Sequence, residues 1–149
     1  MGTVEDFSFY LDNIIISKKR IYKNDCALVC LLMIAKYYYL DVDYTKIKKL
    51  CNLKDEGTSL FNLNQAAKKI GFQTMMVDLP FKKLFSVTIP CIAHINKNHF
   101  VVICGISKYK IFLADPFYSE IRKISHKDFI TTWAKKDGAD SGVLLLIEL

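Results

Sequence analysis

The chain has 149 residues, the length of one domain. Hydrophobic residues make up 52% of the sequence and aromatic residues 13%, so a packed core is expected and intrinsic disorder is excluded. The net charge is +6, but the lysines lie in scattered groups and no nucleic-acid-binding motif is present. Solvated helix faces explain this charge best, with an acidic partner peptide or an anionic membrane surface as the alternative.

The first half of the chain predicts helices. Residues 7–16 have a mixed pattern and are expected to form a strand or an arm, within an N-terminal arm of residues 1–19. Residues 26–39 are apolar around most of a helix circumference, which is typical of a buried central helix, and Asn24 or Asp25 is the expected N-cap.

Two further helices are predicted next. The segment DVDYTKIKKLC is amphipathic and is capped by Asp43. The segment GTSLFNLNQAAKKIG has an apolar stripe at helical spacing, Thr58 or Ser59 as its cap and Gly71 as its stop.

The second half of the chain predicts strands separated by turn signals. One helix interrupts them, SHKDFITTWAK capped by Ser125, and a helical turn is expected at LPFKKLF. The predicted strands are FQTMMV, PCIAHI, HFVVICGI, KIFLAD, EIRKIS and SGVLLLIEL. Helices followed by a meander of strands indicate an α+β domain in which helices pack on an antiparallel sheet.

The cysteines and the hydropathy exclude several other classes of protein. Five irregularly spaced cysteines without a C-x-x-C pair, and only three histidines, argue against a zinc site and against a disulfide scaffold. No apolar run reaches the roughly 18–20 residues of a membrane span, and no secretory signal is evident. A soluble segment is expected, one that could be a domain of a longer membrane protein.

Cys26 is the candidate nucleophile of the chain. In the first turn of a helix, unpaired amide donors and the helix dipole lower the pKa of a thiol. Cys30 lies one turn later and is expected to be a core residue without that help. A structural role for Cys26 stays equally open on position alone.

His99 and Asp115 are the candidate base and orienting acid. A turn of odd length centred on Ser107 would place them directly opposite each other with both side chains on one face, whereas an even turn would separate the faces. An aspartate there can hold the imidazole tautomer and stabilise imidazolium. His94 and His126 are the other histidines, and Asp-Pro is also a common turn opener, so spacing alone leaves this constellation open.

Five segments in order resemble the bacteriocin-processing cysteine peptidases, the N-terminal peptidase domains of peptidase-containing ABC exporters. They are DCALVCLLMIAKYY, EGTSLFNLNQAAKKIGF, IPCIAHINKNHFVVI, IFLADPFYSEI and DFITTW. The resemblance covers about residues 20–149. It implies a papain-like fold, with a helical half containing the nucleophile helix packed on an antiparallel β-sheet. The implied activity is cleavage of a leader peptide after a double-glycine motif before export.

Carried over position by position, the resemblance implies Cys26 as nucleophile, His99 as general base and Asp115 as orienting acid. The chain departs from the family pattern at two positions. Ala27 replaces the glycine of the usual Asp-Cys-Gly motif, and Arg20 stands where the family has its oxyanion-hole glutamine. Arg20 can also donate hydrogen bonds, so it is a candidate substitute donor, or the enzyme is slow.

The resemblance also implies partners. The substrate is expected to be a precursor peptide with an amphipathic helical leader that docks in a hydrophobic groove. Five candidates to line such a groove are Tyr37, Phe61, Met75, Phe117 and Tyr118. No cofactor is expected in this domain, because ATP would bind a separate ATPase domain of the exporter. Transmembrane domains would complete the exporter and hold the peptidase in the cytoplasm at the inner face of the membrane.

Two alternatives stay open. A peptidase-like docking domain that binds the exported substrate without cleaving it, or cleaves it only weakly, would explain Arg20. A different papain-like enzyme, such as a transglutaminase-like or amidase relative, is the other alternative.

Overall fold

The structure is a computed structural model that describes residues 3–16, 25–54, 57–118, 120–136 and 138–149. Its helices are α1 (Thr3–Ile16), α2 (Cys26–Tyr37), α3 (Tyr44–Cys51), α4 (Leu60–Ile70) and α5 (His126–Trp133), with a 3₁₀ helix η1 at Phe81–Ser86. Its strands are β1 (Gln73–Pro80), β2 (Cys91–Ile95), β3 (His99–Ile106), β4 (Lys110–Ala114), β5 (Arg122–Ser125) and β6 (Ser141–Glu148). Among these described residues, no helix has the length and apolar character needed to cross a membrane.

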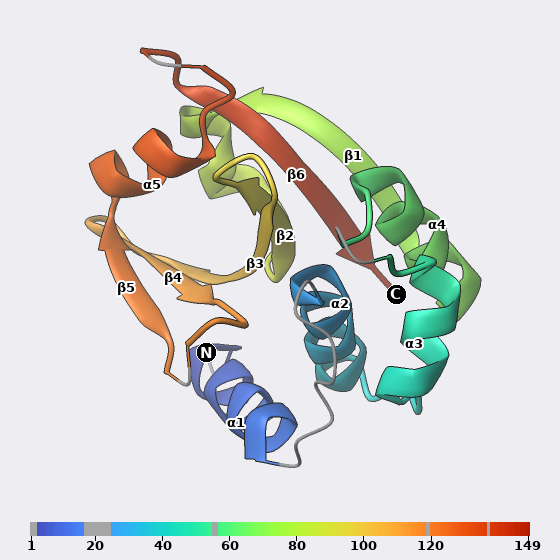
Figure 1. Ribbon diagram of the computed structural model, residues 1–149. Helices are drawn as coiled ribbons and strands as arrows, with labels where there is room; N and C mark the ends of the chain where they lie inside the picture. The colour runs from blue at the N-terminus through green and yellow to red at the C-terminus, as the bar shows by residue number, and fades with distance from the viewer. Residues whose placement is uncertain (1–2, 17–24, 55–56, 119, 137) are drawn as a thin grey trace.

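The strands form one sheet of order β1-β6-β2-β3-β4-β5, in which every neighbouring pair is antiparallel. Figure 1 shows the helices α1 to α4 gathered around one part of the sheet, with α5 at the other side of the molecule. The α+β architecture predicted from the sequence is therefore confirmed, and all six predicted strands are present.

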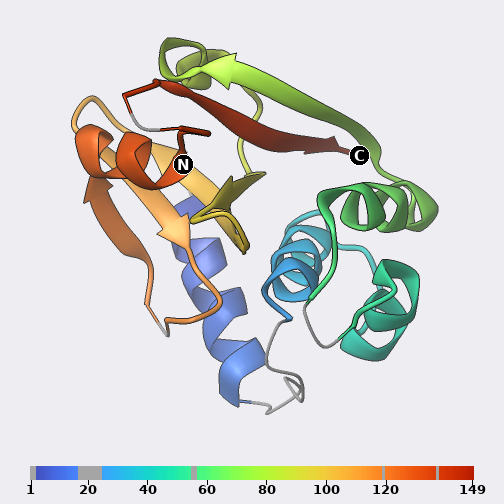
Figure 2. The same ribbon diagram turned by 45° about the horizontal axis from the view of Figure 1, so that its top comes forward.

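Alternating residues on the strands feed two apolar clusters, as period-two side chains do. The larger cluster contains residues 26–35 of α2, which are surrounded by α1, α3, α4 and residues of the sheet such as Phe100 and Val102. The smaller cluster packs Phe129 and Trp133 of α5 against residues such as Ile103. Helix α2 thus runs through the main core, as its apolar circumference predicted (Figure 2).

Three predicted N-caps are confirmed. Each side chain accepts a hydrogen bond from the backbone N–H three residues later, at Asp43, Ser59 and Ser125. Gly71 ends α4 with a φ of 121°, a conformation that favours glycine. Helix α2 ends at Tyr37, two residues before the predicted end, and Tyr39 has a left-handed φ of 61°.

The N-terminal segment corrects one prediction. Residues 7–16 were expected to form a strand or an arm, but Thr3–Ile16 is a helix. Phe7 is fully buried, and its ring stacks on that of Tyr37 at a centroid distance of 5.4 Å. The mixed pattern concealed the helix because its contact with the core is narrow. We infer that α1 is a structural part of the domain.

We therefore expect Phe7→Ala to lower the free energy of unfolding by about 3–5 kcal/mol, the usual cost of deleting a buried phenylalanine. Urea unfolding followed by circular dichroism measures it. Phe9→Ala is the matched control, since Phe9 lies on the same helix with 66% of its surface exposed. Equal midpoints for the two variants would mean that α1 does not pack as described.

Candidate active site

Cys26 is the first residue of α2 and borders a cavity that His99 also lines. Its exposed fraction is 7%, whereas Cys30, one turn later, is fully buried in the core. Burial raises the pKa of Cys51, Cys91 and Cys104 to about 12, so these thiols are poor nucleophiles. As predicted, Cys30 is a core residue, whereas Cys26 lies at a cavity where it can act as a nucleophile.

Asp25 precedes Cys26 at the N-cap position, but its side chain does not cap the helix. The buried carboxylate instead accepts a hydrogen bond of 2.9 Å from the hydroxyl of Tyr44, on α3. First-turn N–H groups have no partner within a helix. Since Asp25 is held away by Tyr44, it leaves these donors and the positive end of the helix dipole beside Cys26.

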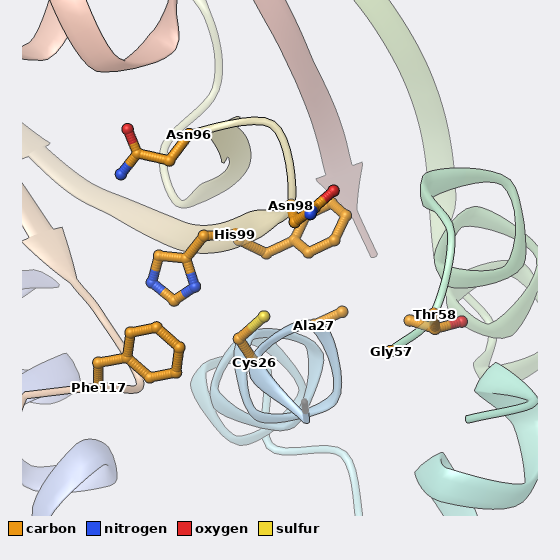
Figure 3. A pocket seen from close by; sticks show the side chains of 9 residues that line it. Cys26, Ala27, Gly57, Thr58, Asn96, Asn98, His99 and Phe117 are labelled. Atoms are coloured by element: carbon orange, nitrogen blue, oxygen red, sulfur yellow. The ribbon is translucent and has the colours of Figure 1, made fainter. Parts of the chain in front are cut away.

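His99 begins β3 and is bonded to Asp115. Its Nε2 donates to Asp115 Oδ1 at 2.6 Å, and the same oxygen accepts the backbone N–H of Phe117 at 3.0 Å. The other ring nitrogen, Nδ1, is buried and has no hydrogen-bond partner among the described residues. Figure 3 shows the imidazole and the Cys26 sulfur pointing toward each other.

The environment of His99 favours its charged form. Burial lowers the pKa of His99, but its side-chain contacts with Asp115 and with the Cys26 sulfur, together with the negative charges of these two groups, outweigh burial and raise this pKa to about 9. The imidazolium is therefore the main form of His99 at neutral pH. A positive charge in this position stabilises a thiolate at Cys26.

The contact between His99 and Asp115 is present, but the predicted register was wrong. Ile106 pairs with Ile111, so an even number of residues, 107–110, lies between these paired positions, and by itself this would place the His99 and Asp115 side chains on opposite faces. A β-bulge between Ile103 and Gly105 shifts the pairing by one residue and restores the shared face. Continued outward, this register puts His99 opposite Phe117 and diagonal to Asp115, within side-chain reach.

The ring of Phe117 agrees with that register. It lies parallel to the imidazole of His99, with centroids 4.2 Å apart and an interplanar angle of 13°. Phe117 itself is 61% exposed, so its other side meets solvent. The ring covers one face of the imidazole and limits its rotation.

A cavity of about 360 Å³ lies over Cys26 and His99. Figure 3 shows Cys26 and Ala27 at the end of α2, with the Asn96–His99 turn on one side and Gly57 and Thr58 on the other. Its lining residues are Cys26, Ala27, Gly57, Thr58, Asn96, Asn98, His99, Phe100 and Phe117. Ala27 and Gly57 are small, so the cavity near the Cys26 sulfur has room for the extended backbone of a bound peptide.

Of the five predicted groove residues, Phe117 alone lines this cavity. Tyr37 is half-buried and packs on Phe7, while Phe61 is exposed in the first turn of α4. Met75 is exposed beside a separate cavity of about 190 Å³ between β1 and β6. Tyr118 lies under the guanidinium of Arg122. A role for these residues in leader binding stays a prediction.

Arg20, the candidate oxyanion donor, lies outside the described residues. Sequence reasoning did not single out Asn96, Asn98 or Arg122, although Asn96 and Asn98 flank the turn before His99, which was a usable signal. Arg122 begins the next strand after Asp115, and the pairing of β4 with β5 brings its side chain back to that carboxylate. In the described part of the chain, no group of three or more histidine, cysteine, aspartate or glutamate side chains is placed to hold a metal ion.

This arrangement can perform nucleophilic acyl chemistry. It combines a thiol at an open helix terminus, a charged imidazole facing the sulfur and a buried carboxylate on the far ring nitrogen. The thiol has the position of a nucleophile, the imidazole that of an acid–base group and the carboxylate that of an orienting group.

Comparison with known proteins places these features in one family. The profile of the peptidase C39 family matches residues 17–137. The colicin V secretion/processing ATP-binding protein CvaB of Escherichia coli is 31% identical over 104 residues, which cover 70% of this chain and 15% of that protein. The lactococcin-G-processing and transport ATP-binding protein LagD of Lactococcus lactis is 31% identical over 142 residues, which cover 86% of this chain and 18% of that protein. The chain thus spans less than a fifth of the length of these relatives.

A solved structure supports the fold. The double-glycine motif protease of an AMS/PCAT transporter, crystallised with a leader peptide, superposes with a TM-score of 0.76 at 26% identity. The match covers 86% of each chain. The predicted papain-like peptidase fold is therefore confirmed.

Proposed function

Since this chain belongs to the peptidase C39 family, we propose that it is a cysteine endopeptidase that cleaves a precursor peptide after a double-glycine motif. The observation that carries this proposal is the cavity in which Cys26 at the start of α2 meets His99, itself bonded to buried Asp115. In this proposal Cys26 is the nucleophile, His99 the acid–base group and Asp115 the residue that orients it.

The first half of the reaction is acylation. The Cys26 thiolate attacks the carbonyl carbon of the second leader glycine, forming a C–S bond and an oxyanion. The first-turn amides of α2, which the Asp25 side chain does not cap, are suitable donors for that oxyanion. As the intermediate collapses, the peptide C–N bond breaks and imidazolium His99 gives its proton to the leaving amine, which begins the mature cargo.

The second half is hydrolysis of the thioester. Neutral His99 takes a proton from water, and the resulting hydroxide attacks the acyl carbon. The C–S bond then breaks and the thiolate–imidazolium pair is restored. The leader departs as a carboxylic acid, which releases its remaining proton to solvent to become the new C-terminal carboxylate. Asp115 accepts the hydrogen bond from Nε2 throughout, which leaves Nδ1 free to face sulfur and substrate.

The shape of the cavity supports a preference for glycine. Ala27 and Gly57 are small, so the cavity near Cys26 has room for a peptide backbone. The rings of Phe100 and Phe117 form other parts of its wall. A side chain on the residue being cleaved would compete with these walls for the space beside the sulfur. Glycine carries no Cβ and meets no such conflict.

The relatives suggest the cellular setting of the reaction. CvaB and LagD are named as secretion or transport proteins that bind ATP. We therefore place this domain in an ABC exporter, with ATP bound by a separate domain and the peptidase at the cytoplasmic face of the membrane. Its partner is a precursor whose amphipathic leader helix docks on the surface of the domain. The reaction itself uses side chains of the chain and water.

The two alternatives have less support. Arg20 motivated the docking domain without activity, but a buried carboxylate and a charged histidine beside Cys26 are costly features that binding alone does not require. Because the chain belongs to the peptidase C39 family, a transglutaminase-like or amidase function has no support.

The test uses two synthetic precursors that differ at one residue. We expect cleavage directly after Gly-Gly, detected by mass spectrometry. Replacing the second glycine of the peptide by valine should lower kcat/KM by roughly 200-fold or more, because the extra carbons must enter the space beside Cys26. Equal cleavage of both peptides, or cleavage at another bond, would contradict the proposal.

A further inference from the structure

The carboxylate of Asp115 has a third partner besides His99 and the Phe117 amide. Asp115 Oδ1 faces those two donors, and Arg122 Nη1 lies 3.7 Å from the other oxygen, Oδ2. The Asp115 side chain is almost fully buried, whereas that of Arg122 is 38% exposed. The guanidinium therefore reaches inward from the surface to the back of the carboxylate.

Arg122 is itself held in place. It is the first residue of β5, and its backbone pairs with Leu113, two residues before Asp115. Its guanidinium lies 4.4 Å from the ring centroid of Tyr118. Tyr118 belongs to the turn that begins at Asp115, because its N–H donates to the Asp115 carbonyl at 2.9 Å. Strand pairing and ring stacking thus fix Arg122 from two directions.

A carboxylate with one oxygen held can still rotate about its terminal torsion, which is broad. A cation at Oδ2 opposes that rotation and keeps Oδ1 toward His99. We propose that Arg122 is a positioning residue of the active site: its guanidinium holds the Oδ2 side of Asp115 and so fixes the oxygen that orients His99. This inference rests on the proposed peptidase function.

The groups that act on His99 come from several elements. Cys26 belongs to α2 and His94 to β2, while Asp115 follows the end of β4 and Arg122 begins β5. Arg122 can affect the His99 pKa in two opposite ways. As a nearby cation it would lower this pKa, whereas by positioning Asp115 it strengthens the bond that raises it. The direction of the change in a variant separates the two roles.

The experiment compares Arg122→Gln with Lys123→Gln. Lys123 is the next residue of β5, is exposed and lies near the Phe112 ring, so its variant removes one positive charge from the same strand away from Asp115. For Arg122→Gln we expect a fall in kcat of about tenfold with little change in KM, as for misplacement of a catalytic group. The alkaline limb of kcat/KM should move to lower pH, Arg122→Lys should recover part of both effects, and Lys123→Gln should match wild type.

A second measurement does not depend on peptide cleavage. The rate at which iodoacetamide alkylates Cys26, located by mass spectrometry, reports the thiolate–imidazolium pair at each pH. Its alkaline transition should also move to lower pH in Arg122→Gln. If wild type shows this transition but cleaves no precursor, the proposed function fails while the role of Arg122 is still measured. An unchanged transition, or one that moves to higher pH, in a variant with wild-type thermal stability would overturn the positioning role.

Discussion

Cys26→Ala is expected to lower kcat for precursor cleavage by about 10⁵- to 10⁶-fold, because loss of the nucleophile removes the covalent route as a whole. The residual rate would come from binding and from the amides at the start of α2. The measurement is single-turnover cleavage of a Gly-Gly precursor with excess protein, followed by mass spectrometry. Binding of the precursor should survive, since alanine occupies less space than cysteine in the cavity.

Cys30→Ala is the matched control for this variant. Cys30 lies one turn along the same helix and is fully buried in the core, so its replacement tests loss of a thiol without loss of the nucleophile. We expect Cys30→Ala to keep kcat near the wild-type value and to lose a little stability. Cleavage by Cys26→Ala at the rate of Cys30→Ala would refute the assignment of Cys26.

Asp115→Asn is expected to lower kcat by about 10³- to 10⁴-fold while leaving the fold intact, because an amide of nearly equal size can present the wrong group to Nε2. Nε2 needs an acceptor at this position, and the asparagine side chain fails to supply one whenever its NH₂, rather than its oxygen, faces the ring. If the imidazole ring turned over to avoid the NH₂ group, Nδ1 would no longer face the Cys26 sulfur. Glutamine at His99 would remove the group itself and serves as the reference for complete loss.

The same variant makes a prediction about pH. In the wild type the pKa of His99 is raised to about 9, so the imidazolium is kept below that pH and is lost as the pH rises through it. Without the Asp115 charge, the His99 pKa should fall toward its ordinary value of about 6.5. The alkaline limb of the pH profile of kcat/KM should therefore move to lower pH.

Histidine resonances followed by NMR measure this pKa without substrate. His94 is separable from His99, because burial lowers its pKa below 6.5. A His99 resonance that still titrates near pH 9 in Asp115→Asn would show that Asp115 is not the main source of the shift.

Local sequence patterns determined the elements of this domain. The apolar circumference of residues 26–37 required a buried helix, and Asp43, Ser59 and Ser125 marked three helix starts through side chains that can accept an N–H. Short runs of strand-forming residues, separated by turn signals, determined the strands. These signals act between residues a few positions apart, which is why they can be recognised in one sequence. These local signals did not predict helix α1, because Phe7 reaches the core from a segment whose pattern is otherwise mixed.

The candidate site could be predicted in its residues but not in its geometry. Cys26, His99 and Asp115 were named from position, pairing and resemblance, and the structure brings their side chains together. The reason given for the pairing was wrong, because the loop has an even number of residues and the bulge at Ile103–Gly105 corrects the face. A bulge depends on how the whole sheet twists and packs, so a hairpin sequence does not reveal it.

The sequence by itself determined which chemistry the chain can perform, since a thiol at a helix start and a histidine–aspartate pair define a small set of reactions. Only the tertiary structure decided how those groups are held. Tyr44 draws the Asp25 carboxylate away from the helix end, Phe117 covers the imidazole, and Arg122 lies behind Asp115. Each contact joins residues from different segments of the chain, and packing and strand pairing determine which of those segments meet.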